Sequence, residues 1–320
     1  MSAPGADPAG GVGLIINPRA TVAHPSVRTE VARMLEPLGL EWHHTTGARG
    51  DAGAMARECV AAGARAVVAL GGDGTVQEVA GALAGTSTVL APLPAGNANV
   101  FARALGWPAR MDDALGVLPG ALAGERRAVH VGRVIADAEE RVFVINAGVG
   151  LDAATVDWIE HRPRTKRHLR QTGFAVGLWL ATMRARGAGT PLHVTLADGQ
   201  ELDLATVLAA CGSPYTYLHG RPLDLVPGAD FSGELRWTGL RRVRPGELGL
   251  LMARVASGRG LGMVSADPDA AVVMGEVGPG LVVRAEEPMP VQADGEAMGM
   301  HTEVVIRPGP RLLVALPAGA

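Results

Sequence analysis

The sequence lacks several features that would place it in familiar classes of protein. It has only two cysteines, Cys59 and Cys211, which stand far apart and outside any CxxC spacing, so neither a disulfide framework nor a zinc site is indicated. No apolar run approaches the roughly 18 residues that a membrane span requires. The segment 1–11 lacks the basic and apolar parts of a signal peptide. We therefore expect a soluble cytoplasmic protein with a disordered leader at 1–11.

A strong excess of charge is also missing. The chain carries 29 Lys and Arg against 32 Asp and Glu, which gives a net charge of −3. Neutralising the phosphates of a nucleic acid requires a basic face over much of a domain, so nucleic-acid binding is not expected. Hydrophobic residues make up 48% of the 320 residues, which is enough for two packed domains.

The first third of the chain alternates between apolar runs and segments of helical spacing. Strands are predicted at 12–17, 40–46, 66–70 and 88–94, and helices at 26–39, at 51–63 and directly after the glycines near residue 72. Asp51 is expected to cap the helix at 51–63. This alternation predicts a doubly wound parallel sheet over 12–125, in which ligands gather at the carboxyl ends of the strands.

The pattern of apolar runs changes after about residue 125. Short β-like runs, among them 141–148, are separated by Gly, Pro and Asp turns, which predicts a mostly antiparallel β-sandwich over 126–300. One inserted helix is expected at 165–187, alone in this half. The predicted fold class is therefore α/β, with a parallel-sheet domain followed by a sandwich domain.

One strand-to-helix turn in the first domain combines glycine with polar residues. It consists of Gly71, Gly72, Asp73, Gly74 and Thr75, with Glu78 one turn further on. Glycines let a ligand approach the main chain, and the start of the next helix favours an anion such as a phosphate. A carboxylate at Asp73 beside a polyphosphate calls for a divalent cation such as Mg²⁺. The alternative is a tight structural turn in which Asp73 or Thr75 caps the helix.

A second turn, PAGNANVFAR at 94–103, repeats this arrangement after the next strand. Gly96 stands at the turn, Asn97 and Asn99 offer donors and acceptors, and Arg103 offers a cation. Neither turn matches the Walker pattern or the dinucleotide fingerprint. Two such turns on neighbouring parallel strands would face one crevice, which favours a phosphate-binding site over two unrelated turns.

Together these motifs resemble the diacylglycerol kinase catalytic-domain family, which includes bacterial lipid kinases and sphingosine kinases. Further segments in the same order, including IINPRA at 15–20, VFVINAGVGLDA at 142–153 and QADGEAMG at 292–299, extend the resemblance over nearly the whole chain. It implies ATP-dependent phosphorylation of a lipid hydroxyl, with diacylglycerol to phosphatidic acid as the first expectation. It also implies that 301–320 returns to the first domain.

The resemblance implies roles for individual residues. Mg²⁺ would be held by Asp73, and Glu296 would be the general base, with Asp294 as its support. By local sequence alone, a hairpin turn is the favoured interpretation of the Asp-Gly-Glu segment, and only the family resemblance reverses this. The residues expected to line the ATP site are Asn17, Thr46, Gly71, Gly72, Gly74, Thr75, Glu78, Gly96, Asn97, Asn99 and Arg103.

Two departures from the family pattern leave alternatives open. Asn97 stands where the family usually has Thr, and Val100 replaces an Asp, which removes a carboxylate from the expected Mg²⁺ surroundings. The alternatives are a sphingoid-base or other glycerolipid kinase, an enzyme like NAD kinase, and a non-catalytic nucleotide- or lipid-binding relative. Whether the chain forms a homodimer stays open.

A basic and apolar segment suggests how the chain would meet a lipid. Basic side chains near an anionic leaflet, followed by an apolar helix, favour shallow peripheral binding to a membrane. The alternative is an ordinary helix packed on the sandwich. The residues concerned are Arg162, Arg164, Lys166, Arg167, Arg170 and Trp179.

Overall fold

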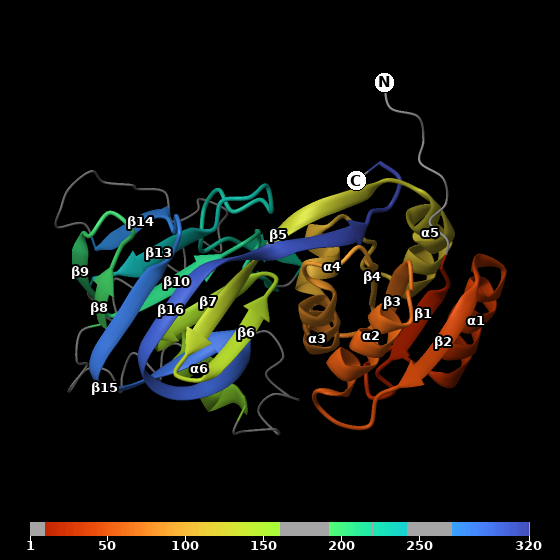
Figure 1. Cartoon of the computed structure of the whole chain (residues 1–320), viewed down its shortest axis with the longest axis horizontal. Coiled ribbons are helices and arrows are strands. Elements are labelled where there is room, and N and C mark those ends of the chain that lie inside the picture. The colour runs from red at the N-terminus through yellow and green to blue at the C-terminus, as the bar shows by residue number, and fades with distance from the viewer. Residues whose placement is uncertain (1–9, 161–191, 219, 242–270, 320) are drawn as a thin grey trace. The chain divides into compact units, whose positions relative to one another are not determined.

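The computed structural model describes residues 10–160, 192–218, 220–241 and 271–319 (Figure 1). The chain divides into two compact units, unit 1 with residues 1–129 and 310–320 and unit 2 with residues 130–309. The sequence predicted these boundaries at residues 125 and 300. They differ because β5 (Arg126–Ala136) and β16 (Glu296–Ala315) each run through a boundary as a continuous strand.

Unit 1 contains the predicted parallel sheet. Its strands are β1 (Val12–Ile16), β2 (Leu40–Thr45), β3 (Ala66–Gly71) and β4 (Val89–Pro94), in the order β2-β1-β3-β4. The end of β16 extends the sheet, with Val314 paired in parallel with Leu90 of β4. Every residue of β1, β3 and β4 is buried, which is why these strands read as continuous apolar runs.

In unit 1, α2 packs against α3, and smaller contacts join α1 to α5 and α3 to α4. Their bounds are α1 (Pro25–Leu35), α2 (Asp51–Ala61), α3 (Asp73–Leu83), α4 (Val100–Ala104) and α5 (Met111–Ala123). The predicted helix at 26–39 ends earlier, at Leu35, and continues as a 3₁₀ turn over Glu36–Leu38. Pro37 removes a backbone donor there, and Gly39 adopts a φ of 83° that ends the turn.

Unit 2 is built on the antiparallel order β14-β13-β10-β7-β15-β16. The bounds are β7 (Asn146–Gly150), β10 (Thr206–Ala210), β13 (Arg236–Leu240), β14 (Val272–Glu276) and β15 (Leu281–Ala293). The smaller strands are β6 (Glu139–Phe143) beside β5, β8 (Leu192–Thr195) beside β15, β9 (Glu201–Leu204) beside β8, and the hairpin of β11 (Thr216–Leu218) and β12 (Arg221–Leu223). The predicted class of fold is thus confirmed.

Two expectations for unit 2 were wrong in detail. The run at 141–148 is not one strand, because the chain leaves the ladder at Val144 and Ile145, whose amides bind a side chain instead. The predicted helix at 165–187 is not alone in this half, since α6 (Leu151–Glu160) follows the positive-φ residue Gly150. The segment 165–187 itself, with the basic residues ahead of it and Trp179, lies outside the described residues.

In the described part of the chain, no helix is long and apolar enough to cross a membrane.

Candidate active site

The predicted nucleotide residues of unit 1 stand at the carboxyl ends of four adjacent parallel strands. Each loop is bonded to its neighbour through the backbone: Thr46 N donates to Ile16 O (2.9 Å), Asn17 N to Leu70 O (2.9 Å), and Ala95 N to Gly71 O (2.9 Å). Because parallel strands end at one edge, the loops that follow β1, β2, β3 and β4 form one row. The structure therefore gathers Asn17, Thr46 and the two glycine turns at one sheet edge, while Glu78 and Arg103 lie within α3 and α4.

Gly72 and Gly96 bring the two glycine turns into backbone contact. A Cβ added at Gly96 would lie 2.6 Å from the Cα of Gly72 and 2.9 Å from Oδ1 of Asn99. A Cβ added at Gly71 would lie 2.5 Å from the Cβ of Thr75. No side chain fits at these positions without moving backbone, so the glycines are required for packing as well as for any ligand that approaches the main chain.

Asp73 does not cap its own helix. Gly72 is the N-cap of α3, without a side-chain hydrogen bond, and Oδ1 of Asp73 instead accepts the N–H of Val100 (2.6 Å) at the start of α4. Burial raises the pKa of Asp73, and hydrogen bonds from the amides of Val100, Phe101 and Asn99 counter this in part. Asp73 therefore fastens the second glycine turn to the first through a desolvated carboxylate.

Two further side-chain bonds tie the β1 loop to the glycine turns. Nδ2 of Asn17 donates to Oγ1 of Thr75 (3.0 Å), so Thr75 does not cap α3 either. Oγ1 of Thr21 lies 3.1 Å from Oδ1 of Asn97. Thr21 was missed by the sequence reasoning, because a single Thr in a loop carries no pattern. With both predicted caps absent, the purely structural interpretation of the 71–75 turn loses its main support.

Asn99 supports the second turn from within. Its Oδ1 accepts the N–H of Gly96 (2.8 Å), and its Nδ2 donates to the carbonyl of the same residue (3.0 Å). Asn99 adopts a φ of 47°, a left-handed conformation that Asn tolerates better than most residues. Gly74 lies in the first turn of α3, and Arg103 is a partly exposed residue of α4.

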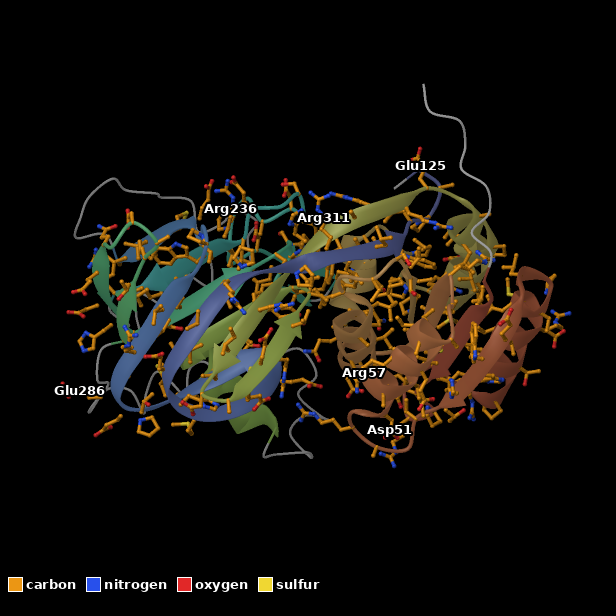
Figure 2. The ribbon with its side chains drawn as sticks, viewed as in Figure 1. Asp51, Arg57, Glu125, Arg236, Glu286 and Arg311 are labelled. Atoms are coloured by element: carbon orange, nitrogen blue, oxygen red, sulfur yellow. The ribbon has the colours of Figure 1, made fainter. Side chains whose placement is uncertain are left out.

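Glu78 acts on a different helix from its own. Its Oε1 accepts the N–H of Gly50 (2.8 Å) and its Oε2 the N–H of Ala52 (3.1 Å), at the start of α2. Asp51, expected to cap this helix, instead accepts the amides of Gly47 and Ala48 through Oδ2, at the junction of the loop and α2 (Figure 2). The cap comes from another helix because α3 packs against α2, a contact that local sequence does not reveal.

In unit 2, Asp294 is clamped by backbone amides. Its Oδ2 accepts the N–H of Val144 (2.7 Å), and its Oδ1 accepts those of Ile145 (2.8 Å) and Asn146 (3.0 Å). Asp294 and Gly295 both have positive φ, at 50° and 78°. The Asp-Gly-Glu segment is thus a tight turn between β15 and β16 whose carboxylate holds the break between β6 and β7.

Glu296, the expected base, is the first residue of β16. Its Oε2 lies 3.8 Å from Nη1 of Arg141, and both side chains are 23% exposed. Nη2 of Arg141 binds Oε1 of Glu139 at 2.6 Å. Arg141 was not identified from the sequence, although it is a cation in β6, the strand just before the amides that bind Asp294. Glu296 is thus a partly exposed carboxylate beside a cation, on the strand that follows the Asp-Gly turn.

Behind this turn lies a buried polar cluster that sequence reasoning also missed. Its members are Asn146, Asp152, Tyr215 and Gln292, linked by hydrogen bonds of 2.6 to 2.9 Å. All four fall in segments that carried the family resemblance, but no spacing rule connects residues so far apart in the chain. The pairing of β15 with β7 brings Gln292 to Asn146, and Asp152 of α6 links Gln292 to Tyr215.

Within the described residues, no group of three or more His, Cys, Asp or Glu side chains is arranged to hold a metal ion. Mg²⁺ is often bound through one or two carboxylates and the phosphates of a substrate. Asp73 meets that requirement in chemistry, since it is a carboxylate that no ion pair neutralises among the described residues. The residues present therefore fit a metal held jointly with a phosphate.

Comparisons with known proteins agree with this geometry. The family of the diacylglycerol kinase catalytic domain matches residues 11–134. A protein named "Probable lipid kinase YegS-like" from Pseudomonas syringae pv. syringae is 47% identical over 87 residues, 27% of this chain and 27% of that protein. "Probable lipid kinase YegS" from Salmonella newport is 33% identical over 142 residues, 43% of this chain and 44% of that protein. The chain thus matches less than half the length of these relatives.

A crystal structure described as a diacylglycerol kinase from Bacillus anthracis str. Sterne has the same fold. It superposes with a TM-score of 0.66 at 20% identity, covering 96% of this chain and 97% of that one. The expected resemblance is confirmed, because residues 11–134 match the diacylglycerol kinase catalytic domain.

Proposed function

We propose that the protein is an ATP-dependent lipid kinase, with diacylglycerol as its acceptor and phosphatidic acid as its product. The observation that carries the proposal is the contact between the turns at Gly72 and Gly96. Two glycine turns meet at the ends of adjacent parallel strands beside a desolvated carboxylate, within a catalytic domain of this family. Such a corner exposes main-chain N–H groups to a phosphate.

In unit 1 the residues bind and orient the nucleotide. The main chain of Gly72 and of the first turn of α3 would carry the phosphates, with Gly96 packed against Gly72. The bonded pair Asn17 and Thr75 would present an amide and a hydroxyl beside them. Bound ATP supplies the γ-phosphoryl group, and Mg²⁺, which Asp73 would hold, would supply neutralising positive charge. Because phosphoryl transfer depends mainly on positioning and charge, the cross-links between these loops are the main contribution of the chain.

In unit 2 the residues act on the hydroxyl group of the lipid acceptor. The lipid hydroxyl oxygen forms a bond to the γ-phosphorus while the bond to the departing ADP breaks, and the hydroxyl proton passes to a carboxylate oxygen of Glu296. Arg141 holds this carboxylate in place through its ion pair. Asp294 does not take part in the proton transfer, because its oxygens are occupied by three amides. Its role is to fix the turn that carries Glu296.

The test is transfer of labelled phosphate from ATP, with Mg²⁺, to diacylglycerol, sphingosine, monoacylglycerol and NAD presented separately. Wild type is compared with Asp73→Ala, Glu296→Gln and Glu303→Gln, the last a control at an exposed ion pair with Arg284. Labelled phosphatidic acid that disappears in the first two variants and persists in the control supports the proposal. Label in sphingosine or NAD alone contradicts the proposal that diacylglycerol is the acceptor. ATP binding without transfer to any acceptor contradicts the proposal that the protein is a kinase.

We propose, as a separate point, that the basic residues at 162–170 and Trp179 bring the protein to an anionic membrane surface. This rests on sequence alone, because those residues lie outside the described part of the chain. Co-sedimentation with vesicles that contain an anionic phospholipid tests it. Replacing Arg162, Arg164 and Lys166 with Gln should reduce the bound fraction, and binding that does not change, or that is equal on neutral vesicles, contradicts the proposal.

A further inference from the structure

Gln292 is a fully buried side chain that uses its whole amide group on three partners. Nε2 donates to Oδ1 of Asn146 (2.9 Å) and to Oδ2 of Asp152 (2.6 Å), and Oε1 accepts the backbone N–H of Gly295 (2.8 Å). If the amide group were rotated by half a turn, Oε1 would face the acceptors of Asn146 and Asp152, and Nε2 would face the N–H of Gly295. Its orientation is therefore fixed, and with it the position of the Gly295 amide.

Asp152, the partner of Gln292 on α6, is a buried carboxylate without a cation. Tyr215 donates its hydroxyl to Oδ1 (2.8 Å), and no Lys, Arg or His of the described ranges forms an ion pair with it. Burial raises the pKa of Asp152, while the bonds from Tyr215 and Gln292 lower it in part. A Cβ at Gly148 would overlap its Oδ2. Burying an unpaired carboxyl group works against stability, which points to another reason for its presence.

The turn that Gln292 holds is conformationally demanding. Asp294 has a φ of 50°, a left-handed value that is uncommon for residues with a side chain, although Asp adopts it more often than most. Its carboxylate is held by the amides of the β6–β7 break, and the next amide, that of Gly295, is held by Gln292. Glu296 follows directly. The turn is thus fixed at two consecutive residues, by amides of the β6–β7 break and by a side chain of β15.

We propose that Asp152, Tyr215 and Gln292 form a positioning device for Glu296. The Tyr215 hydroxyl orients the Asp152 carboxylate, Asp152 orients the Gln292 amide, and Gln292 fixes the backbone from which Glu296 projects. None of the three touches the reacting atoms. The inference rests on the proposed function, in which Glu296 accepts the proton of the lipid hydroxyl.

The pH dependence of kcat in Gln292→Glu tests the positioning device. The introduced carboxyl group can still accept a hydrogen bond from the Gly295 N–H. It also faces Asp152, and it forms a hydrogen bond to Asp152 only while the two carboxyl groups share a proton. As pH rises the pair ionises, and the like charges repel. We expect kcat to fall at least about tenfold relative to wild type between about pH 6 and about pH 9, with the KM for ATP within about twofold of wild type. The other titratable groups near the turn, Tyr215, Asp294, Glu296 and Cys211, are common to both proteins.

A second variant exchanges the carboxyl group of Asp152 and the amide group of Gln292. In Gln292→Glu combined with Asp152→Asn, one carboxylate faces one amide, so their hydrogen bond needs no shared proton. The pH dependence should return to within about threefold of wild type, a rescue that a merely structural role would not produce. Tyr215→Phe is the mildest variant, because only a hydroxyl is lost. It should lower kcat about fivefold, which corresponds to one hydrogen bond, with the KM for ATP unchanged.

A control variant and a measurement that needs no activity allow this inference to fail independently of the proposed function. Thr206→Val removes a buried hydrogen bond to Val149 O in the same sheet and should not change the pH profile. Hydrogen exchange at the Gly295 amide needs no activity, so it tests the device even if wild type phosphorylates no acceptor. Its protection factor should fall with rising pH in Gln292→Glu and return in the exchanged pair. Protection equal to wild type at every pH, or a KM for ATP that rises as kcat falls, overturns the inference.

Discussion

Oδ1 of Asp73 lies 2.6 Å from the backbone nitrogen of Val100, so a carboxylate at the start of α3 caps α4. The same residue is the expected Mg²⁺ ligand, and it therefore has two separable functions. One is to fasten the two glycine turns together by a hydrogen bond. The other is to provide negative charge for a cation.

The two functions of Asp73 can be separated by substitution. In Asp73→Asn the amide oxygen still accepts the Val100 N–H but the charge is gone, and in Asp73→Ala both are lost. Because burial raises the pKa of Asp73, removing the charge relieves desolvation. We expect Asp73→Asn to be as stable as wild type or more so, with kcat reduced at least about 100-fold, and Asp73→Ala to lose about 1 kcal/mol of unfolding free energy. Urea unfolding and phosphate transfer measure the two effects. Full activity in Asp73→Asn would show that the charge is not used.

Gly96→Ala should damage the nucleotide site. Its methyl group would lie 2.6 Å from the Cα of Gly72, so the two turns must separate. We expect ATP binding, measured by calorimetry, to weaken at least about tenfold, and unfolding free energy to fall by about 1–3 kcal/mol. Gly116→Ala in α5 is the matched control, since nothing lies within 4 Å of an added Cβ. That change should stabilise the helix by about 0.5–1 kcal/mol and leave ATP binding intact. Equal effects of the two changes would contradict the assignment.

Glu78→Ala should destabilise the protein by about 1–2 kcal/mol, because Gly50 N and Ala52 N at the start of α2 lose their acceptors. Glu58→Ala, on the exposed face of the same helix, should change the unfolding free energy by less than about 0.5 kcal/mol. Thermal melts of the two variants give the comparison. If the two melts coincide, the hydrogen bonds of Glu78 contribute nothing measurable.

His301 should make stability depend on pH. Nδ1 lies 2.7 Å from Oδ2 of Asp137 and Nε2 lies 2.9 Å from the carbonyl of Met298, so both ring nitrogens face acceptors and the imidazolium form satisfies them. Burial alone lowers the pKa of His301, but the bonds to Asp137 and Met298 outweigh it and the net pKa is raised. This stabilisation is complete below the ordinary pKa of about 6.5 and is lost as pH rises through the raised value.

Urea unfolding of wild type and His301→Gln from about pH 5.5 to about pH 8.5 measures this dependence. The difference in unfolding free energy between the two proteins should be largest at the acid end and shrink with rising pH. His193→Gln is the control, because the pair of His193 with Asp203 is solvent-exposed and should contribute little. A difference for His301→Gln that grows with pH would contradict the assignment.

Much of unit 1 follows from local sequence. The apolar runs at 66–70 and 88–94 became β3 and β4 because a strand buried on both faces must be apolar throughout, and the glycines after them stand where only glycine fits. The kinase family was recognisable because GGDGT and the Asp-Gly-Glu segment are contiguous motifs. Such features depend on neighbours in the chain, and these are visible in a sequence.

The partners of the polar side chains were decided by tertiary structure. Asp73 and Glu78 bind helices other than their own, and Asp51 binds the preceding loop rather than the helix that it was expected to cap. Gln292 meets Asp152 across 140 positions of the chain. A hydrogen bond requires a donor and an acceptor about 3 Å apart, and that proximity arises when strands pair and helices pack. The sequence by itself determined the sheet, the glycine turns and the family. The fold alone decided which amides each carboxylate holds.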